Sequence, residues 1–137
     1  MADEIKIIGM KKMENSIESM IPEEIDEFIP KEMQKDVLEI IINDDEVFGG
    51  ENYEKKAQRA YSLARFYNME KIKADSKNDE DSVQAAIKHA FAYFTIYTVS
   101  SRRAINEYED TSERNRKREE RKDNLKSFIK EFSNHSN

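Results

Sequence analysis

The stretch from Ser82 to Tyr108 constrains the fold more than any other part of the sequence, because its middle has no polar face. One row of apolar and small residues recurs at the spacing of three and four that places side chains on one helix face. This row comprises Val83, Ala86, Ile87, Ala90, Phe91, Phe94, Tyr97, Thr98, Ser101, Ile105 and Tyr108. A second row, on the opposite side, comprises Ala85, Ala92, Tyr93, Ile96 and Val99. Because a helix that is apolar nearly all round must be surrounded by other elements, the sequence predicts a central helix inside a bundle.

Composition narrows the class to a single all-α domain. The chain has 137 residues, which suits one hydrophobic core, and only three Gly and two Pro interrupt it. The absence of Cys excludes a disulfide framework and any Cys-ligated metal. No run of eighteen apolar residues occurs and the N-terminus lacks a signal-peptide pattern, so we expect neither export by that route nor a membrane partner.

The N-terminal part divides at its two prolines. Met1–Lys12 is short enough to form an extended arm or one strand. Pro22 and Pro30 each stand where proline is tolerated, in the first turn of a helix, and they open PEEIDEFI and KEMQKDVLEIII. The sequence therefore predicts two short helices with a break at Ile29–Pro30.

The segment NDDEVFGG, Asn43–Gly50, has the composition of a loop, because Asn and Asp form local side-chain bonds and Gly allows left-handed backbone. Its oxygen ligands prompt a comparison with an EF-hand calcium loop. That pattern requires Gly at the sixth position, where Phe48 stands, and Val47 occupies a ligand position. A solvated loop is the better interpretation.

A second long helix is predicted from Tyr53 to Ile72. One stripe of this helix holds Tyr53, Ala57, Ala60, Tyr61, Ala64 and Tyr67, and a second holds Leu63, Phe66 and Met69. The alanines allow close packing against the central helix. The polar stretch Lys73–Asp81 then forms a surface connection, with Asp81 as the expected N-cap of the central helix.

After Tyr108 the character of the chain changes. Asp110 or Thr111 is placed to cap a new helix, and Glu113–Asp123 contains no apolar residue. An apolar stripe at helical spacing follows, made of Leu125, Phe128, Ile129 and Phe132. We therefore expect a helical bundle with an N-terminal arm over residues 1–110, and over residues 111–137 a charged spacer with an amphipathic C-terminal arm that lacks a partner within the chain.

The charges are distributed unevenly. Met1–Glu54 holds 16 acidic and 5 basic residues, a balance of −11, whereas Lys55–Asn137 holds 13 acidic and 18 basic residues, a balance of +5. This asymmetry indicates that the two parts pair within the fold or meet on neighbouring copies of the protein.

No motif of catalysis or cofactor binding is present. His89 and His135 are the only histidines, and a lone helical histidine is more often packed or at the surface than a ligand or base. Aromatic residues of the central helix offer a pocket lining, but at their spacing a core role is favoured; they are Phe91, Tyr93, Phe94 and Tyr97. We expect no enzyme activity, no catalytic residue, no metal and no cofactor.

The basic residues of Glu113–Asp123 form the sharpest candidate site. An arginine-rich helix can bind phosphates, but four acidic residues reduce the excess here to two positive charges, and no aromatic residue is available for stacking on bases. A solvated, self-paired face is the favoured interpretation. The possible inter-subunit or phosphate contacts are Arg102, Arg103, Arg114, Arg118 and Arg121.

The layout over Tyr53–Phe132, with ENYEKKAQRAYSLARFY, then VQAAIKHAFAYFTIYTVSSRR and then NLKSFIKEF, resembles the small all-helical head-tail connector (adaptor) proteins of tailed phages. The resemblance implies a non-enzymatic virion protein that assembles as a ring beneath the portal and links head to tail. It also implies partners: further copies of the chain, the portal protein and a neck or tail protein, with DNA passing nearby without specific recognition. The stripe Leu125, Phe128, Ile129 and Phe132 would then dock on the portal.

Two other classes stay open. A small helical binding module could inhibit or regulate a host protein in the cytoplasm, with the C-terminal stripe laid in a groove. A weak nucleic-acid binder could use the Arg-rich helix. Ring formation would distinguish a connector from both of these classes. Salt-dependent affinity for DNA or RNA would distinguish the nucleic-acid binder from the regulatory module.

Overall fold

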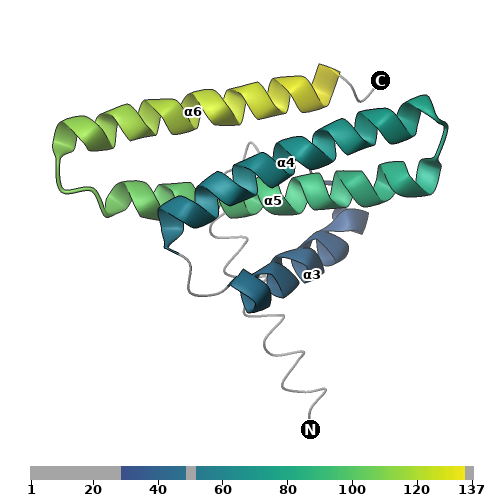
Figure 1. Ribbon diagram of the computed structural model, residues 1–137, viewed down its shortest axis with the longest axis horizontal. Coiled ribbons are helices and arrows are strands. Elements are labelled where there is room, and N and C mark those ends of the chain that lie inside the picture. The colour runs from purple at the N-terminus through teal and green to yellow at the C-terminus, as the bar shows by residue number, and fades with distance from the viewer. Residues whose placement is uncertain (1–28, 49–51, 135–137) are drawn as a thin grey trace, which may run out of the picture.

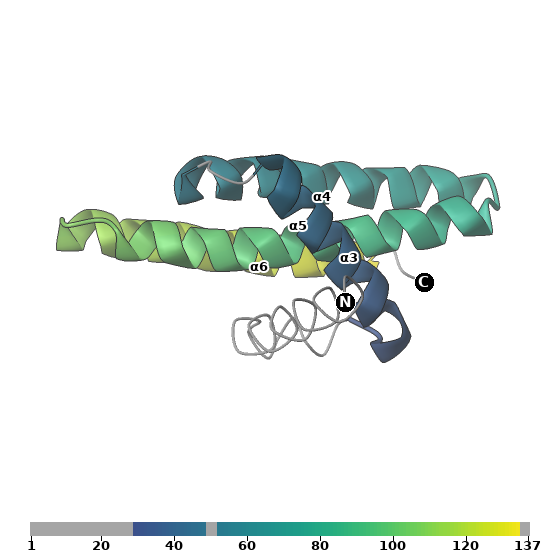
Figure 2. The same cartoon turned by 90° about the horizontal axis from the view of Figure 1, so that it is seen from below.

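The computed structural model describes residues 29–48 and 52–134. Over these ranges the chain forms four helices and no strand, which confirms the all-α prediction: α3 (Lys31–Phe48), α4 (Tyr53–Ser76), α5 (Glu80–Asn106) and α6 (Thr111–Asn134). Helix α5 is the central element. Helix α4 runs antiparallel along it, and α3 and α6 lie on opposite sides of α5 (Figures 1 and 2).

Helix α5 is buried nearly all round, as its sequence predicts. Residues of the first row, such as Phe94, are buried, and so are Ala92 and Ile96 of the second row. The helix begins earlier than expected. Asp79, and not Asp81, is the N-cap: its carboxylate accepts a hydrogen bond from the backbone N–H of Ser82 at 3.2 Å.

Helix α4 packs on α5 through its alanines, as predicted: Ala57, Ala60 and Ala64 are buried. Small side chains let two helices approach closely. The helix also runs one turn further than predicted, to Ser76, so that the connection to α5 is only Lys77–Asn78–Asp79, where Asn78 has a φ of 57°. Asn tolerates this left-handed backbone better than most residues do.

The predicted loop Asn43–Gly50 is wrong in its first part, because α3 continues as a helix to Phe48. The cause is a long-range ion pair. The guanidinium of Arg59 donates two hydrogen bonds to the two carboxylate oxygens of Asp44, at 2.9 and 3.2 Å, and the Asp44 side chain is buried. The inward-facing carboxylate is therefore satisfied by a side chain of α4.

The expectation of a C-terminal arm without an intramolecular partner is also wrong. Phe128 and Phe132 are buried, and they belong to the same apolar cluster as Phe91 and Phe94. The rings of Phe128 and Phe94 stack with centroids 4.0 Å apart, and those of Phe132 and Phe91 lie 4.9 Å apart. Burying this stripe against α5 removes apolar area from water, which stabilises the docked helix.

Some sequence predictions fall outside the described residues. These are the arm Met1–Lys12, the helix opened by Pro22, the glycines at 49 and 50, and His135 in the tail.

Candidate functional site

Several basic residues of Glu113–Asp123, on α6, make contacts within the bundle. The Arg114 guanidinium donates to the carbonyl oxygen of Tyr108 through Nε, at 3.1 Å, and through a second nitrogen. Arg121 donates to Ser101 Oγ and to the carbonyl oxygen of Thr98, both at 2.9 Å. These two arginines do not pair with the acidic residues of the run, as the predicted self-paired face would require; they tie α6 to α5 and to the loop before α6.

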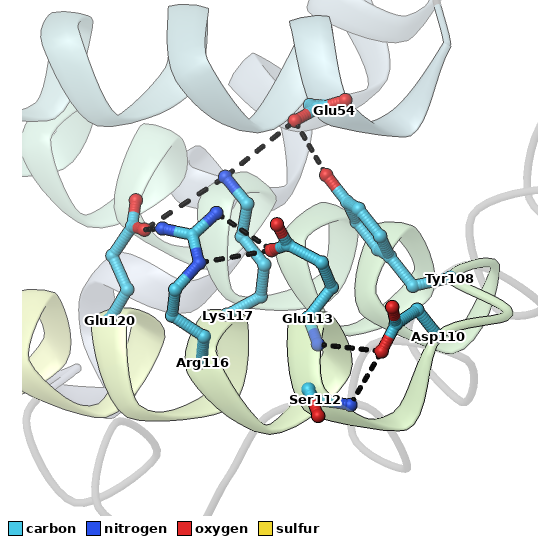
Figure 3. A network of polar contacts seen from close by, with 8 residues as sticks. All are labelled: Glu54, Tyr108, Asp110, Ser112, Glu113, Arg116, Lys117 and Glu120. Atoms are coloured by element: carbon cyan, nitrogen blue, oxygen red, sulfur yellow. Dashed lines mark hydrogen bonds and ion pairs between the residues drawn. The ribbon is translucent and has the colours of Figure 1, made fainter.

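The start of α6 is held by a polar network between three elements (Figure 3). The carboxylate of Asp110 accepts hydrogen bonds from the backbone N–H groups of Ser112 and Glu113, as the predicted cap requires. Glu54 of α4 accepts a hydrogen bond of 2.9 Å from the Tyr108 hydroxyl and lies 3.7 Å from Lys117 Nζ. Helix α6 is therefore fastened to α4 at this end through charges.

Further pairs on the same surface stay within α6. Arg116 lies 2.8 Å from Glu113 and 3.8 Å from Glu120, and Lys117 also lies 3.8 Å from Glu120 (Figure 3). The hydrogen bond to Glu54 is the main reason that the pKa of Tyr108 is raised. Tyr108 therefore stays neutral at physiological pH and acts as a hydrogen-bond donor.

A groove of about 350 Å³ opens between α4 and α6 over α5. Its residues are Glu54, Ala57, Gln58, Tyr61, Ser62, Tyr97, Ser101, Ala104, Ile105, Tyr108, Lys117, Glu120, Arg121 and Asn124. Burial raises the pKa values of Tyr61 and Tyr97, and the Tyr97 hydroxyl accepts a hydrogen bond of 3.0 Å from Asn124. The groove thus presents neutral phenols and paired charges.

The other predicted arginines lie at the surface. Arg102 and Arg118 are exposed. Arg103 donates a hydrogen bond of 3.2 Å to the Tyr53 hydroxyl, and its guanidinium carbon lies 5.4 Å from the centre of that ring. The five candidates therefore fall into two groups: Arg114 and Arg121 are half-buried and bond to neighbouring residues of the bundle, whereas Arg102, Arg103 and Arg118 are exposed.

The predicted pairing of the acidic first part with the basic remainder occurs within the fold, and three such ion pairs join described residues. These pairs are Asp36 with Lys88 at 2.8 Å, Asp44 with Arg59 at 2.9 Å, and Glu54 with Lys117 at 3.7 Å. Whether neighbouring copies also pair stays a prediction.

The outer face of α4 carries the large hydrophobic side chains that are exposed within the described ranges. Phe66 is 53% exposed and Met69 is 54% exposed. We call these two residues the α4 patch. The sequence places both on a second stripe of α4, but no described helix covers that side.

The α4 patch borders an aromatic surface. The ring of Phe66 meets Tyr67 edge-on at 5.2 Å, and Tyr67 stacks on both His89 and Tyr93, at 4.7 and 5.7 Å. His89 also faces the carbonyl oxygen of Ala85 through Nδ1 at 2.8 Å, so its predicted packed or surface role is confirmed. A groove of about 380 Å³ between α4 and α5 begins at this surface and extends past Lys77 and Asp79.

Sequence reasoning missed two buried polar residues, Asn68 and Lys71. Both continue the alanine row of α4 at the same spacing of three and four, so the row itself was the available signal. Lys71 Nζ donates a hydrogen bond of 3.2 Å to the carbonyl oxygen of Phe132.

The described residues contain no group of three or more His, Asp or Glu side chains that could hold a metal ion. Within the same ranges no helix is long and apolar enough to cross a membrane. Comparisons with family models, curated proteins and solved structures found no match to the chain.

Proposed function

We propose that the protein is a non-enzymatic assembly subunit of the head-tail connector class, which associates with copies of itself in a ring beneath a phage portal and joins head to tail in the virion. The observation that carries the proposal is the α4 patch. Exposed apolar side chains that gather on one face mark protein–protein contacts more often than scattered ones do. Phe66 and Met69 lie one helical turn apart and continue into the aromatic surface of Tyr67 and His89.

The contact surface differs from the one that the sequence suggested. Phe128 and Phe132 are committed to the core, so they could dock on a partner only if α6 left the bundle. The α4 patch is available without any such rearrangement. We therefore assign contact with the neighbouring copy or the portal to the outer face of α4, with DNA passing nearby without specific recognition.

The mass of the protein in solution, measured by light scattering, tests the proposal. We expect a ring-sized species, or a monomer that joins purified portal rings, and we expect the double variant Phe66→Ser/Met69→Ser to lose this association. Lys55→Ser, on an exposed position of the same helix, is the matched control and should associate like the natural chain. A monomer that ignores portal rings would overturn the connector proposal.

A second candidate is a helical module that binds and regulates a host protein, and the same patch favours it. Such a module would stay monomeric and bind one partner through Phe66 and Met69 with no effect of portal. Retention of a host protein by the natural chain, lost in Phe66→Ser/Met69→Ser and kept in Lys55→Ser, together with a monomeric mass, would favour this candidate over the connector.

A further inference from the structure

The connection between α5 and α6, Glu107–Asp110, contains no residue that forces the chain to reverse. None of its residues is glycine, and none has a positive φ. The backbone N–H groups of Glu107 and Tyr108 continue α5, because they donate to the carbonyl oxygens three residues earlier at 3.2 and 3.1 Å. The hydrogen bonds of α6 already begin at Asp110, whose carbonyl oxygen accepts from the Arg114 N–H at 2.9 Å. The helical hydrogen bonds are therefore interrupted over a short stretch of ordinary backbone.

The connection between α4 and α5 is different. Asn78 has a φ of 57°, which a right-handed helix excludes, and the carbonyl oxygen of Ala74 accepts hydrogen bonds from the N–H groups of both Lys77 and Asp79. This left-handed residue fixes a reversal of the chain. The sequence EYED between α5 and α6 has no such residue, and its glutamates are good helix formers. A straight helix is therefore far more accessible across the second connection than across the first.

The hydrogen bonds that hold the α5–α6 turn lie mostly at the surface. Asp110 accepts from the N–H groups of Ser112 and Glu113, and the Tyr108 hydroxyl donates to Glu54 (Figure 3). The turn also projects beyond the first turn of α4 at one end of the described bundle (Figures 1 and 2). Straightening would give up the Asp110 cap and gain helical backbone hydrogen bonds, so the two forms of the connection differ by a few exposed hydrogen bonds.

A straightened connection would remove α6 from its own bundle and expose Phe128 and Phe132, which are buried. These rings need a surface of matching shape and polarity, because Arg121 on the same side of α6 donates to the carbonyl oxygen of Thr98. Helices α4 and α5 of any other copy present this surface. A second copy is therefore a partner that fits α6, since the contacts within the chain already demonstrate the fit.

We infer that two copies of the chain exchange α6. In each copy α5 and α6 straighten into one helix of about 80 Å, and its α6 docks on α5 and α4 of the other copy. Because α6 runs antiparallel to α5 (Figure 1), the two long helices lie antiparallel about a two-fold axis. The contacts of α6 are the same in two closed monomers and in one exchanged dimer, so the connection and the protein concentration set the balance. Exchange does not use the α4 patch, so it is independent of the proposed function.

Sedimentation over a series of protein concentrations measures the dimerisation constant. All chains carry Phe66→Ser/Met69→Ser, so that the α4 patch does not contribute. Asp110→Ala removes the cap of α6 in both copies and should raise the constant about 30-fold. Asp79→Ala is the matched control, because it removes the equivalent cap of α5 next to the left-handed Asn78, and it should leave the constant unchanged.

Thr111→Pro should keep the chain monomeric. Thr111 is the exposed first residue of α6, a position where proline suits the closed form. In a straight helix the same proline would clash with the carbonyl oxygen of Glu107. Glu109→Gly is a milder variant of the same kind, and in the Asp110→Ala chain it should reverse most of the increase, because glycine disfavours a continuous helix. Circular dichroism checks that both variants stay helical.

The absence of Cys allows the exchanged contact to be observed directly. A chain spin-labelled at Ser127→Cys, an exposed position beside Phe128, is mixed with an isotope-labelled chain that carries no spin label, and the two are unfolded and refolded together. Exchange should broaden the amide NMR signals around Phe94 in the isotope-labelled chain, because Phe128 stacks on Phe94. Thr111→Pro in both chains should abolish this broadening.

Three results would overturn the inference. The first is a monomer, with and without Asp110→Ala, up to about 1 mM, the effective concentration that a short connection provides. The second is a dimer that Thr111→Pro and Glu109→Gly leave intact. The third is broadening confined to α3 or to the outer face of α4, which would assign the dimer to another surface. Loss of ring formation with exchange intact would contradict only the proposed function, and the reverse would contradict only the exchange of α6.

Discussion

Lys71 of α4 donates a hydrogen bond of 3.2 Å to the carbonyl oxygen of Phe132 in the last turn of α6, and its ammonium lies 3.8 Å from the centre of the Phe132 ring. The carbonyl groups of a last helical turn have no partner within their own helix, and a cation there is favourable. One buried side chain thus caps a helix that is 61 residues distant in sequence and packs on its aromatic anchor. Asn68, one turn earlier, is buried beside this contact with its Oδ1 unpaired among the described residues.

In the natural chain the free energy of unfolding should rise with pH as Lys71 loses its proton, and Lys71→Met should abolish this rise. Burial lowers the pKa of Lys71 below its ordinary value of 10.5, and Asp75 only partly offsets this effect. The unfolded chain therefore binds more protons than the folded chain between the folded-state and unfolded-state pKa values. Stability increases as pH rises through that window, by about 1.4 kcal/mol for each pH unit that the window spans. Urea unfolding at a series of pH values up to 10.5 should show this rise in the natural chain relative to Lys71→Met. A constant difference between the two proteins would contradict the prediction.

Phe128→Ala should destabilise the fold by about 3 to 5 kcal/mol, because it removes a buried ring that stacks on Phe94 and leaves a cavity. Phe66→Ala is the matched control. Its ring is 53% exposed, so the same chemical change should alter stability by only about 0.5 kcal/mol. Chemical denaturation followed by circular dichroism measures both. Equal effects would mean that α6 does not share the core of α5.

Asp44→Ala should cost about 3 kcal/mol or more, because it removes a carboxylate that is only 1% exposed and that accepts two hydrogen bonds from the Arg59 guanidinium. Asp36→Ala breaks the pair with Lys88, whose two side chains are 46% and 31% exposed, and should cost less than about 1 kcal/mol. Thermal unfolding of the two variants compares a buried and an exposed pair directly. A small effect at Asp44 would indicate that the end of α3 adjusts freely.

Arg121→Met should weaken the attachment of α6 by about 1.5 to 3 kcal/mol, since Thr98 and Ser101 lose a charged donor at 2.9 Å. Arg118→Met, one turn away and exposed, should have almost no effect on stability. Hydrogen exchange of the α6 amides reports the change locally. Equally faster exchange in both variants would show that the positive charge of α6, and not these hydrogen bonds, holds the helix on the bundle.

The fold was predictable where side-chain chemistry repeats along the chain. The rows of α5 and the alanines of α4 have a helical period, so their burial follows from position alone. The end of α3 was not predictable, because Asp44 favours a loop locally and becomes helical through a partner fifteen residues later. Tertiary contacts of this kind override local preference.

The candidate surfaces show the same limit. The hydrophobic pattern gives no sign that the polar half of α6 contacts the bundle. Its inward side nevertheless continues the stripe of Phe128 at the same helical spacing, through Arg114, Lys117, Arg121 and Asn124. Long basic side chains bury their stems and carry their charges to carbonyl and carboxylate partners, which a hydrophobic pattern cannot register. The exposure of the α4 patch could not be predicted from the sequence either, since it depends on how many helices surround α4.

Tyr97→Phe should change how stability responds to alkaline pH. Burial raises the pKa of Tyr97 above its ordinary value of 10.0, although the hydrogen bond from Asn124 and the charge of Arg121 oppose this shift. Its contribution is therefore complete below pH 10.0 and is lost as pH rises through the folded-state pKa, because the unfolded chain ionises first. At neutral pH the variant should be less stable by about 0.5 to 1.5 kcal/mol, the usual value of one hydrogen bond. Urea unfolding above pH 10.0 should show this gap narrowing, because phenylalanine has no proton to lose. A gap that stays constant with pH would place the Tyr97 hydroxyl in contact with water, and α6 would then cover α5 less closely than the Asn124 hydrogen bond indicates.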